Sequence, residues 1–236
     1  MSVLPLSALI PTLNAAAGLP ATLAALRGQV TEIIIADGGS SDATRDIAQA
    51  AGARVLMGAR GRGVQLRAAA EAATQPWLLA MHADTRPGPG WQDTVAGFIA
   101  RPEAEAQAGY FRFRLDDAAP EARRLEAMVA WRCRTLGLPY GDQGLLIARD
   151  FYWTLGGFEP VPLMEDVALI RRIGHKRLVA LPADFITSAE KWRRDGWYAR
   201  SARNLFCLLL WFAGVSPERI ARIYAFPVRL RSREKR

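Results

Sequence analysis

The stretch EIIIADGGSSD, residues 32–42, decides the fold of this 236-residue chain. Three consecutive isoleucines form a β-branched run that is typical of a buried strand, and the run ends in Asp37 followed by two glycines. A continuous apolar strand fits a parallel sheet that helices cover on both faces. Ligands of such sheets bind at the carboxyl ends of the strands. The stretch therefore predicts an α/β protein with a ligand site beside Asp37.

The sequence on both sides of this stretch alternates strand and helix patterns. We expect further strands over 6–10, ended by Pro11, and over 54–57 and 77–81. We expect helices over 19–27, over 42–51 with Asp42 as N-cap, and over 63–73. This alternation predicts a central, mostly parallel sheet flanked by helices. The strand over 77–81 leads into His82-Ala83-Asp84, so two strand ends carry an acidic residue.

The second half of the sequence is less regular. Alternating aromatic and basic residues predict a strand over 110–114, and an apolar run predicts another over 144–148. We expect helices over 121–136, 164–173, 197–213 and 217–228. Neither a repeat nor a linker is evident, so we expect one domain over 1–228 and a basic C-terminal tail over 229–236.

The charge of the chain favours anionic partners. Its net charge is +8, and all of its 31 basic residues are arginines except Lys176, Lys191 and Lys235. Arginine suits phosphates and carboxylates, so a nucleotide, a phosphorylated acceptor, an acidic membrane or a nucleic acid would each fit. A nucleic-acid-binding module would explain the charge and the strand over 110–114. It would not explain acids at two strand ends, and no nucleic-acid motif is evident, so we predict no nucleic-acid partner.

The remaining composition excludes several classes of protein. Half of the residues are hydrophobic, which is globular composition. Cys133 and Cys207 are distant in sequence and are expected to be reduced, and with two histidines a zinc cluster is improbable. The N-terminus lacks the charged segment of a signal peptide, so we expect a cytoplasmic protein. The apolar run 205–215 is about half the ~20 residues of a membrane span. We interpret it as a buried closing helix; docking on a membrane surface or another subunit is the alternative.

Four motifs give the chain a family resemblance. IPTLN (10–14), the opening stretch (32–42), HADT (82–85) and GGF (156–158) with MED (164–166) resemble family 2 glycosyltransferases. The resemblance covers roughly residues 6–224 and implies a GT-A nucleotide-sugar-binding fold with C-terminal helices. GDQG, PLMED and GVSPER, which begin at residues 141, 162 and 214, resemble a narrower bacterial subgroup labelled for arsenosugar biosynthesis. That subgroup includes the selenosugar synthase of selenoneine biosynthesis, which moves a sugar from a UDP-sugar to selenophosphate.

Three positions depart from the family pattern. Ala15 stands where many members have Glu, Gly38 where many have a second Asp, and His82 where the metal motif usually begins with Asp. These changes affect base recognition and the surroundings of the metal. They leave the final carboxylate of the metal motif, Asp84, in place.

The resemblance implies a donor site. Asp84 would hold Mg²⁺ or Mn²⁺ against the diphosphate of a UDP-sugar, since both ions prefer oxygen ligands; a cap before Pro87 is the alternative. Asp37 would accept a hydrogen bond from uracil or ribose, unless it forms an Asx-turn with the glycines that follow. His82 would add a metal or phosphate contact or serve as a structural turn residue. The other residues expected to bind the nucleotide sugar are Pro11, Thr12, Asn14, Arg60, Arg62 and Gln65, the last three lying near a Gly- and Arg-rich loop that would otherwise be a solvated turn.

The resemblance also implies an acceptor site. Asp166, or else Glu165, would act as general base in a single inverting displacement; a plain acidic helix start is the alternative. An ionised acceptor such as selenophosphate needs no strong base, and the pair would then orient sugar hydroxyls. The acceptor would be small and anionic, with selenophosphate as the specific hypothesis and a lipid phosphate or an arsenical as alternatives. The residues expected to bind it, or else to form a turn and a basic surface, are Gly141, Asp142, Gln143, Lys191, Trp192 and Arg193.

Overall fold

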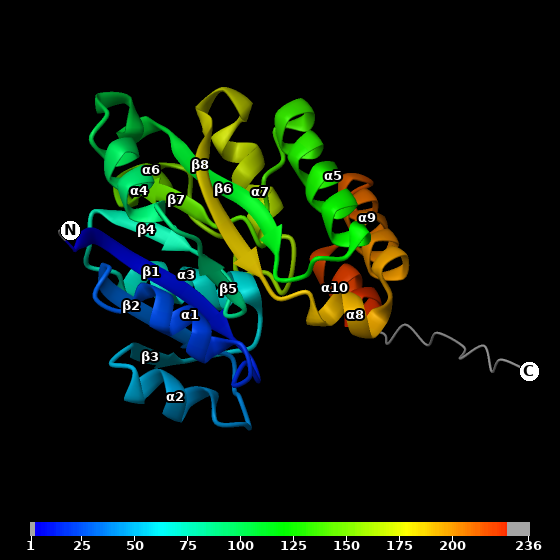
Figure 1. Ribbon diagram of the computed structural model, residues 1–236, viewed down its shortest axis with the longest axis horizontal. Helices are drawn as coiled ribbons and strands as arrows, with labels where there is room; N and C mark the ends of the chain where they lie inside the picture. The colour runs from blue at the N-terminus through cyan, green and yellow to red at the C-terminus, as the bar shows by residue number, and fades with distance from the viewer. Residues whose placement is uncertain (1–2, 226–236) are drawn as a thin grey trace, which may run out of the picture.

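The computed structural model describes residues 3–225, which form one eight-stranded sheet with helices on both of its faces (Figure 1). The strand order is β3-β2-β1-β4-β7-β6-β8-β5. The strands are β1 Leu4–Thr12, β2 Val30–Asp37, β3 Arg54–Met57, β4 Trp77–Ala80, β5 Thr85–Pro87, β6 Ala108–Leu115, β7 Leu145–Ala148 and β8 Leu178–Thr187. The α-helices are α1 Leu19–Leu26, α2 Thr44–Ala50, α3 Arg62–Ala72, α4 Trp91–Ile99, α5 Pro120–Leu136, α6 Arg149–Thr154, α7 Glu165–Ile173, α8 Glu190–Asp195, α9 Trp197–Phe212 and α10 Pro217–Ala225.

The first four strands pair in parallel, as the alternation of strand and helix predicts. The prediction that Pro11 ends the first strand is wrong, because β1 continues to Thr12. The carbonyl of Leu9 faces β4 and accepts a bond from Met81, and Pro11 faces the same side two residues later. Because β4 has already ended there, the missing N–H of proline leaves no ladder bond unmade. The parallel half therefore positions Thr12 opposite Asp37 at its carboxyl edge.

The second half of the sheet is mixed. β7 runs antiparallel to β4 and β6, β8 is parallel to β6, and β5 is antiparallel to β8, so four of the seven strand pairings are parallel. The sequence did not reveal β8, whose apolar run is broken by Pro182. That residue lies where the register between β6 and β8 shifts, and such an irregularity tolerates proline.

Two apolar clusters hold the fold together. The larger one fills both faces of the parallel half and includes fully buried Leu6, Leu9 and Ile34. The smaller one joins β6, α5 and α8 through Phe113, Val129 and other residues. Cys133 and Cys207 are buried and free, as expected.

Helix α9 contradicts the expectation of a buried closing helix. Leu205, Phe206, Leu209 and Phe212 are 54%, 52%, 57% and 44% exposed, whereas Cys207 and Leu208 are buried. Within residues 3–225, no helix is long and apolar enough to cross a membrane. The end of the last predicted helix, beyond 225, and the tail 229–236 lie outside the described residues.

Candidate active site

The Asx-turn that was the alternative role for Asp37 is present at the end of β2. The carboxylate of Asp37 is fully buried and accepts hydrogen bonds from the Thr12 hydroxyl at 2.9 Å, from the backbone N–H groups of Gly39 and Ser40 at 3.1 and 2.8 Å, and from the Ser40 hydroxyl. Burial alone would raise the pKa of Asp37, but these hydrogen bonds lower it below its usual value. The Asp37 carboxylate therefore fixes the loop that follows β2 through these hydrogen bonds. Its contact with a nucleotide stays a prediction.

The other predicted donor residues fix neighbouring loops. Asn14 adopts a left-handed backbone with φ of 50°, and its side-chain oxygen accepts a bond from the Ser41 N–H at 2.9 Å. The amide nitrogen of Gln65 donates to the carbonyls of Thr12 and Ala36, each at 2.7 Å, so it ties α3 to β1 and β2. Pro11 is part of β1, and Arg60 is exposed on the loop before α3. Gln65 thus holds the start of α3, and the loop before it, against the ends of β1 and β2.

A candidate metal centre lies directly after β4. One ligand atom from each of His82, Asp84 and Asp142 lies within 4.8 Å of the others. The Asp84 carboxylate forms an ion pair with the ammonium of Lys191 at 2.7 Å. Asp142 was expected in the acceptor site, but the loop before β7 brings it back beside His82. One imidazole and two carboxylates form a donor set that divalent Mn²⁺ accepts.

The contacts of His82 define its tautomer. One ring nitrogen, Nδ1, contacts the Asp142 carboxylate, and the other, Nε2, contacts the Arg62 guanidinium. Because guanidinium only donates, Nε2 must accept and Nδ1 must carry the proton. Burial would raise the pKa of Asp142, but the adjacent His82 and the charges of Lys191 and Arg62 hold it well below its usual range. Asp142 is therefore a carboxylate at neutral pH.

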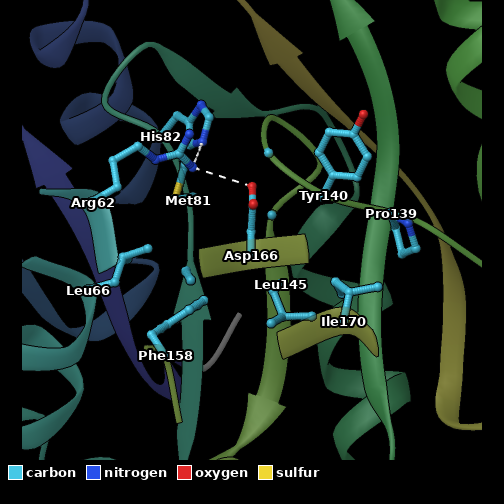
Figure 2. A pocket seen from close by; sticks show the side chains of 13 residues that line it. Arg62, Leu66, Met81, His82, Pro139, Tyr140, Leu145, Phe158, Asp166 and Ile170 are labelled. Atoms are coloured by element: carbon cyan, nitrogen blue, oxygen red, sulfur yellow. Dashed lines mark hydrogen bonds and ion pairs between the residues drawn. The ribbon is translucent and has the colours of Figure 1, made fainter. Parts of the chain in front are cut away.

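The acid pair lies at the start of α7, and its second member, Asp166, points into a pocket that Met81 and His82 also line (Figure 2). Asp166 lines this pocket together with Arg62, His82 and Tyr140, whereas Glu165 is fully buried behind it. Arg62 approaches Glu165 with Nε at 3.1 Å and Asp166 with Nη2 at 3.6 Å. Arg62 thus connects the acid pair to His82 and the candidate metal centre. Of the two acids, Asp166 is the one placed to meet a substrate.

Burial raises the pKa of Glu165 to about 7, because Arg62 offsets only part of the desolvation and Asp166 adds repulsion. Both Glu165 oxygens are buried without a hydrogen bond, although Arg62 is close. Helix α7 begins after Met164, which has a left-handed φ of 69°. A non-glycine residue there costs about 1 kcal/mol or more and is retained where the surrounding structure requires it. Here it directs Glu165 inward at the first turn.

This buried acid predicts a pH-dependent stability. In the folded protein Glu165 holds its proton up to about pH 7, whereas in the unfolded chain it loses it near 4.5. The folded state binds more protons in that window, so the stabilisation is complete below pH 4.5 and is lost as pH rises through 7. Between pH 4.5 and pH 8, the free energy of unfolding of wild type should fall by about 3 kcal/mol relative to that of Glu165→Gln, as measured by urea titrations at each pH. Glu71→Gln, at an exposed i,i+4 pair, serves as control; parallel pH curves for all three proteins would contradict the raised pKa.

Three residues predicted to bind the acceptor are engaged elsewhere. The Gln143 amide bonds to Phe111, Arg132 and Cys133 within the protein. Trp192 is buried against Phe113 in the smaller cluster, and Arg193 pairs with Asp116 and Asp117 at 3.1 and 2.8 Å. Gly141, Asp142 and Lys191 lie beside the pocket or the metal centre, and acceptor binding by the predicted residues stays a prediction. Lys191, Trp192 and Arg193 are adjacent in sequence, but they lie in the first turn of α8 and their side chains therefore point in different directions.

Sequence reasoning missed Tyr140 as a pocket residue. Its ring lies against the Arg132 guanidinium at 3.8 Å, and Asp166 lies across the pocket from it (Figure 2). The only signal was its place beside Gly141, whose φ of 73° turns the chain toward the pocket.

A parallel half-sheet whose strand ends adjoin a candidate metal centre, next to a pocket lined by His82 and Asp166, fits a GT-A glycosyltransferase. Residues 7–154 match the family described as "Glycosyl transferase family 2". The chain belongs to this family.

Solved structures share the fold. Glucosyl-3-phosphoglycerate synthase from Mycobacterium tuberculosis, in complex with Mn²⁺, UDP and glucosyl-3-phosphoglycerate, has a TM-score of 0.61 at 20% identity over 89% of this chain and 80% of that chain. S. aureus TarS 1-349 in complex with UDP-GlcNAc has a TM-score of 0.60 at 13% identity over 94% of this chain and 71% of that chain. Comparison with curated proteins finds no match.

Proposed function

We propose that this glycosyltransferase moves glucose or N-acetylglucosamine from a UDP-sugar to a small anionic acceptor, with inversion at the anomeric carbon. The observation that carries the proposal is that Asp166 lines the same pocket as His82, a member of the candidate metal centre, with Arg62 between them. A single displacement needs a leaving diphosphate on one side of the anomeric carbon and the acceptor on the other. The diphosphate would lie against the candidate metal centre beside His82, and the acceptor would lie beside Asp166.

The donor side has residues that fit a divalent ion. Asp84 and Asp142 would hold it, and His82 would join them by giving up its contact with Arg62 or Asp142; an imidazole ligand favours Mn²⁺ over the oxygen-seeking Mg²⁺. A bound divalent ion neutralises the charge that builds up on the diphosphate as it leaves. Lys191 now pairs with Asp84 and would turn to a phosphate oxygen once the donor binds. Mn²⁺ and UDP bound to the similarly folded synthase, and UDP-GlcNAc bound to TarS, support this donor chemistry.

The acceptor side contains the acid pair. Asp166 would take the acceptor's proton as the new bond forms, since its carboxylate lines the pocket. Glu165 is buried behind it and would set the position of the Arg62 guanidinium. With an acceptor that is already ionised, Asp166 would accept hydrogen bonds from sugar hydroxyls instead.

The specific acceptor that we propose is selenophosphate. The resemblance to the selenosugar synthase subgroup supports it, and so do the Arg62 and Lys191 cations beside the pocket and metal centre. The phosphorylated product in the similarly folded synthase is also a small anion. An arsenical or a lipid phosphate is the alternative, and the family membership favours any of these enzymes over a nucleic-acid-binding module.

Turnover tests the proposal. The protein is incubated with UDP-glucose or UDP-N-acetylglucosamine, with Mn²⁺ or Mg²⁺, and with selenophosphate, phosphate, arsenate or a lipid phosphate. We expect metal-dependent UDP release and a product whose mass is that of the sugar joined to selenophosphate through selenium. UDP release with another acceptor only would reassign the acceptor. No UDP release from either donor, together with no metal-dependent UDP binding, would refute the donor assignment.

A further inference from the structure

Exposed apolar side chains gather on two helices. Among residues 3–225, ten large hydrophobic side chains are strongly exposed, and eight of them belong to α5 or α9. We call these eight the α5–α9 face: Met128, Trp131, Leu136, Tyr198, Leu205, Phe206, Leu209 and Phe212. Exposed apolar patches of this kind mark binding surfaces in soluble proteins.

The face is continuous across the two helices. On α9 the exposed positions recur at intervals of three and four residues from Tyr198 through Leu205 and Leu209 to Phe212, which places them along one side of the helix. The Tyr198 hydroxyl accepts a hydrogen bond from Arg124 of α5 at 3.1 Å, so the two exposed sides adjoin. In Figure 1 both helices lie at the edge of the molecule farthest from β1–β3.

The opposite side of α9 is firmly attached. Arg200 and Arg203 pair with Asp195 at 3.0 and 2.9 Å, and their guanidinium groups lie over the Tyr224 ring of α10 at 4.9 and 5.3 Å. The exposed residues of α9 therefore belong to a helix that its other side holds in place.

The charges around the face are mostly positive, with Glu218 of α10 as an exposed acid. Helix α9 contains no acidic residue, and Arg124 and Arg134 are exposed on α5. Helix α10 packs on α9 and exposes Arg219 and Arg222. The described chain ends there at 225, and the sequence 229–236 that follows has five basic residues and one acid.

We propose that the α5–α9 face docks on the surface of an anionic phospholipid bilayer. Its aromatic and aliphatic side chains would enter the boundary between headgroups and acyl chains, while the surrounding arginines would contact lipid phosphates. Apolar insertion and basic charge reinforce each other, and stable peripheral binding requires such a pair of signals. A second copy fits less well, because a symmetric contact would bring the same arginines of both copies together.

The test is co-sedimentation of the full chain with vesicles of phosphatidylcholine, with or without one third phosphatidylglycerol. We expect binding to the phosphatidylglycerol vesicles, weakened by added salt. The double variant Phe206→Ser, Leu209→Ser should lower the partition coefficient at least about tenfold. Met57→Ser is the matched control, because Met57 is 60% exposed on β3, distant from the face, and it should bind like wild type.

Three results would overturn the proposal: no binding of wild type to phosphatidylglycerol vesicles, an equal loss in the Met57→Ser control, or a dimer that only the double variant dissociates while vesicle binding stays unchanged. The last result would assign the face to a second copy of the chain. UDP release is measured without vesicles, so the outcome of this test is independent of the proposed sugar transfer.

Discussion

Replacing Asp84 by Asn should lower metal-dependent UDP release about a thousandfold. The substitution keeps the size of the side chain and removes the charge that would hold a divalent ion beside His82 and Asp142. The fold should be retained, because the ion pair with Lys191 that is lost is partly exposed to solvent and contributes less than about 1 kcal/mol. Rates of UDP release and calorimetric titration with Mn²⁺ in the presence of UDP measure the two effects.

Asp93→Asn provides the matched control for this variant. Asp93 is an exposed acid in the first turn of α4, outside the candidate metal centre, so its substitution should leave both rate and Mn²⁺ binding unchanged. If Asp84→Asn releases UDP at the wild-type rate, Asp84 is not a metal ligand, regardless of the result for Asp93→Asn.

Replacing Arg62 by Met should lower the free energy of unfolding by about 2 kcal/mol and UDP release about a hundredfold. Arg62 is the cation that faces Glu165 and Asp166, and its loss leaves a fully buried acid without a partner. The stability effect is smaller than for a fully buried pair, because the Arg62 side chain is 31% exposed. Urea denaturation at pH 8 and the rate of UDP release measure the change.

A second substitution distinguishes lost charge pairing from lost packing. Glu165→Gln in the Arg62→Met background removes the unpaired acid, so it should restore roughly half of the lost stability without restoring turnover. Arg45→Met, at an exposed arginine of α2, should change neither quantity. Additive losses in the double variant would show that Arg62 and Glu165 do not interact.

The parallel half of the fold was predictable because each of its signals is local. The isoleucine run of β2, the turn residues at 37–39 and the helix signals of α1 and α3 each lie within about ten residues. The mixed half was harder to predict. β8 contains a proline and β5 spans Thr85–Pro87, so their pairing depends on partners about a hundred residues away.

The candidate site divides in the same way. Asp84 and His82 follow a strand directly, so their position was evident from the sequence. Asp142 was placed with the acceptor, because only the antiparallel return into β7 brings it beside His82. Likewise, the burial of Trp192 depends on Phe113 from β6, which its neighbours in the sequence do not reveal.

The close contact between the start of α3 and the loop before α7 has a further consequence. A Cβ at Gly63 would lie 2.0 Å from the Glu159 carbonyl oxygen, and the backbone N–H groups of Gly63 and Arg62 bond to the carbonyls of Val161 and Pro162. The loop expected to hold the nucleotide and the loop that leads to the acid pair are therefore joined by backbone hydrogen bonds. If a bound donor moves the first loop, we expect these contacts to move the second loop with it and so to couple nucleotide binding to the position of the acid pair.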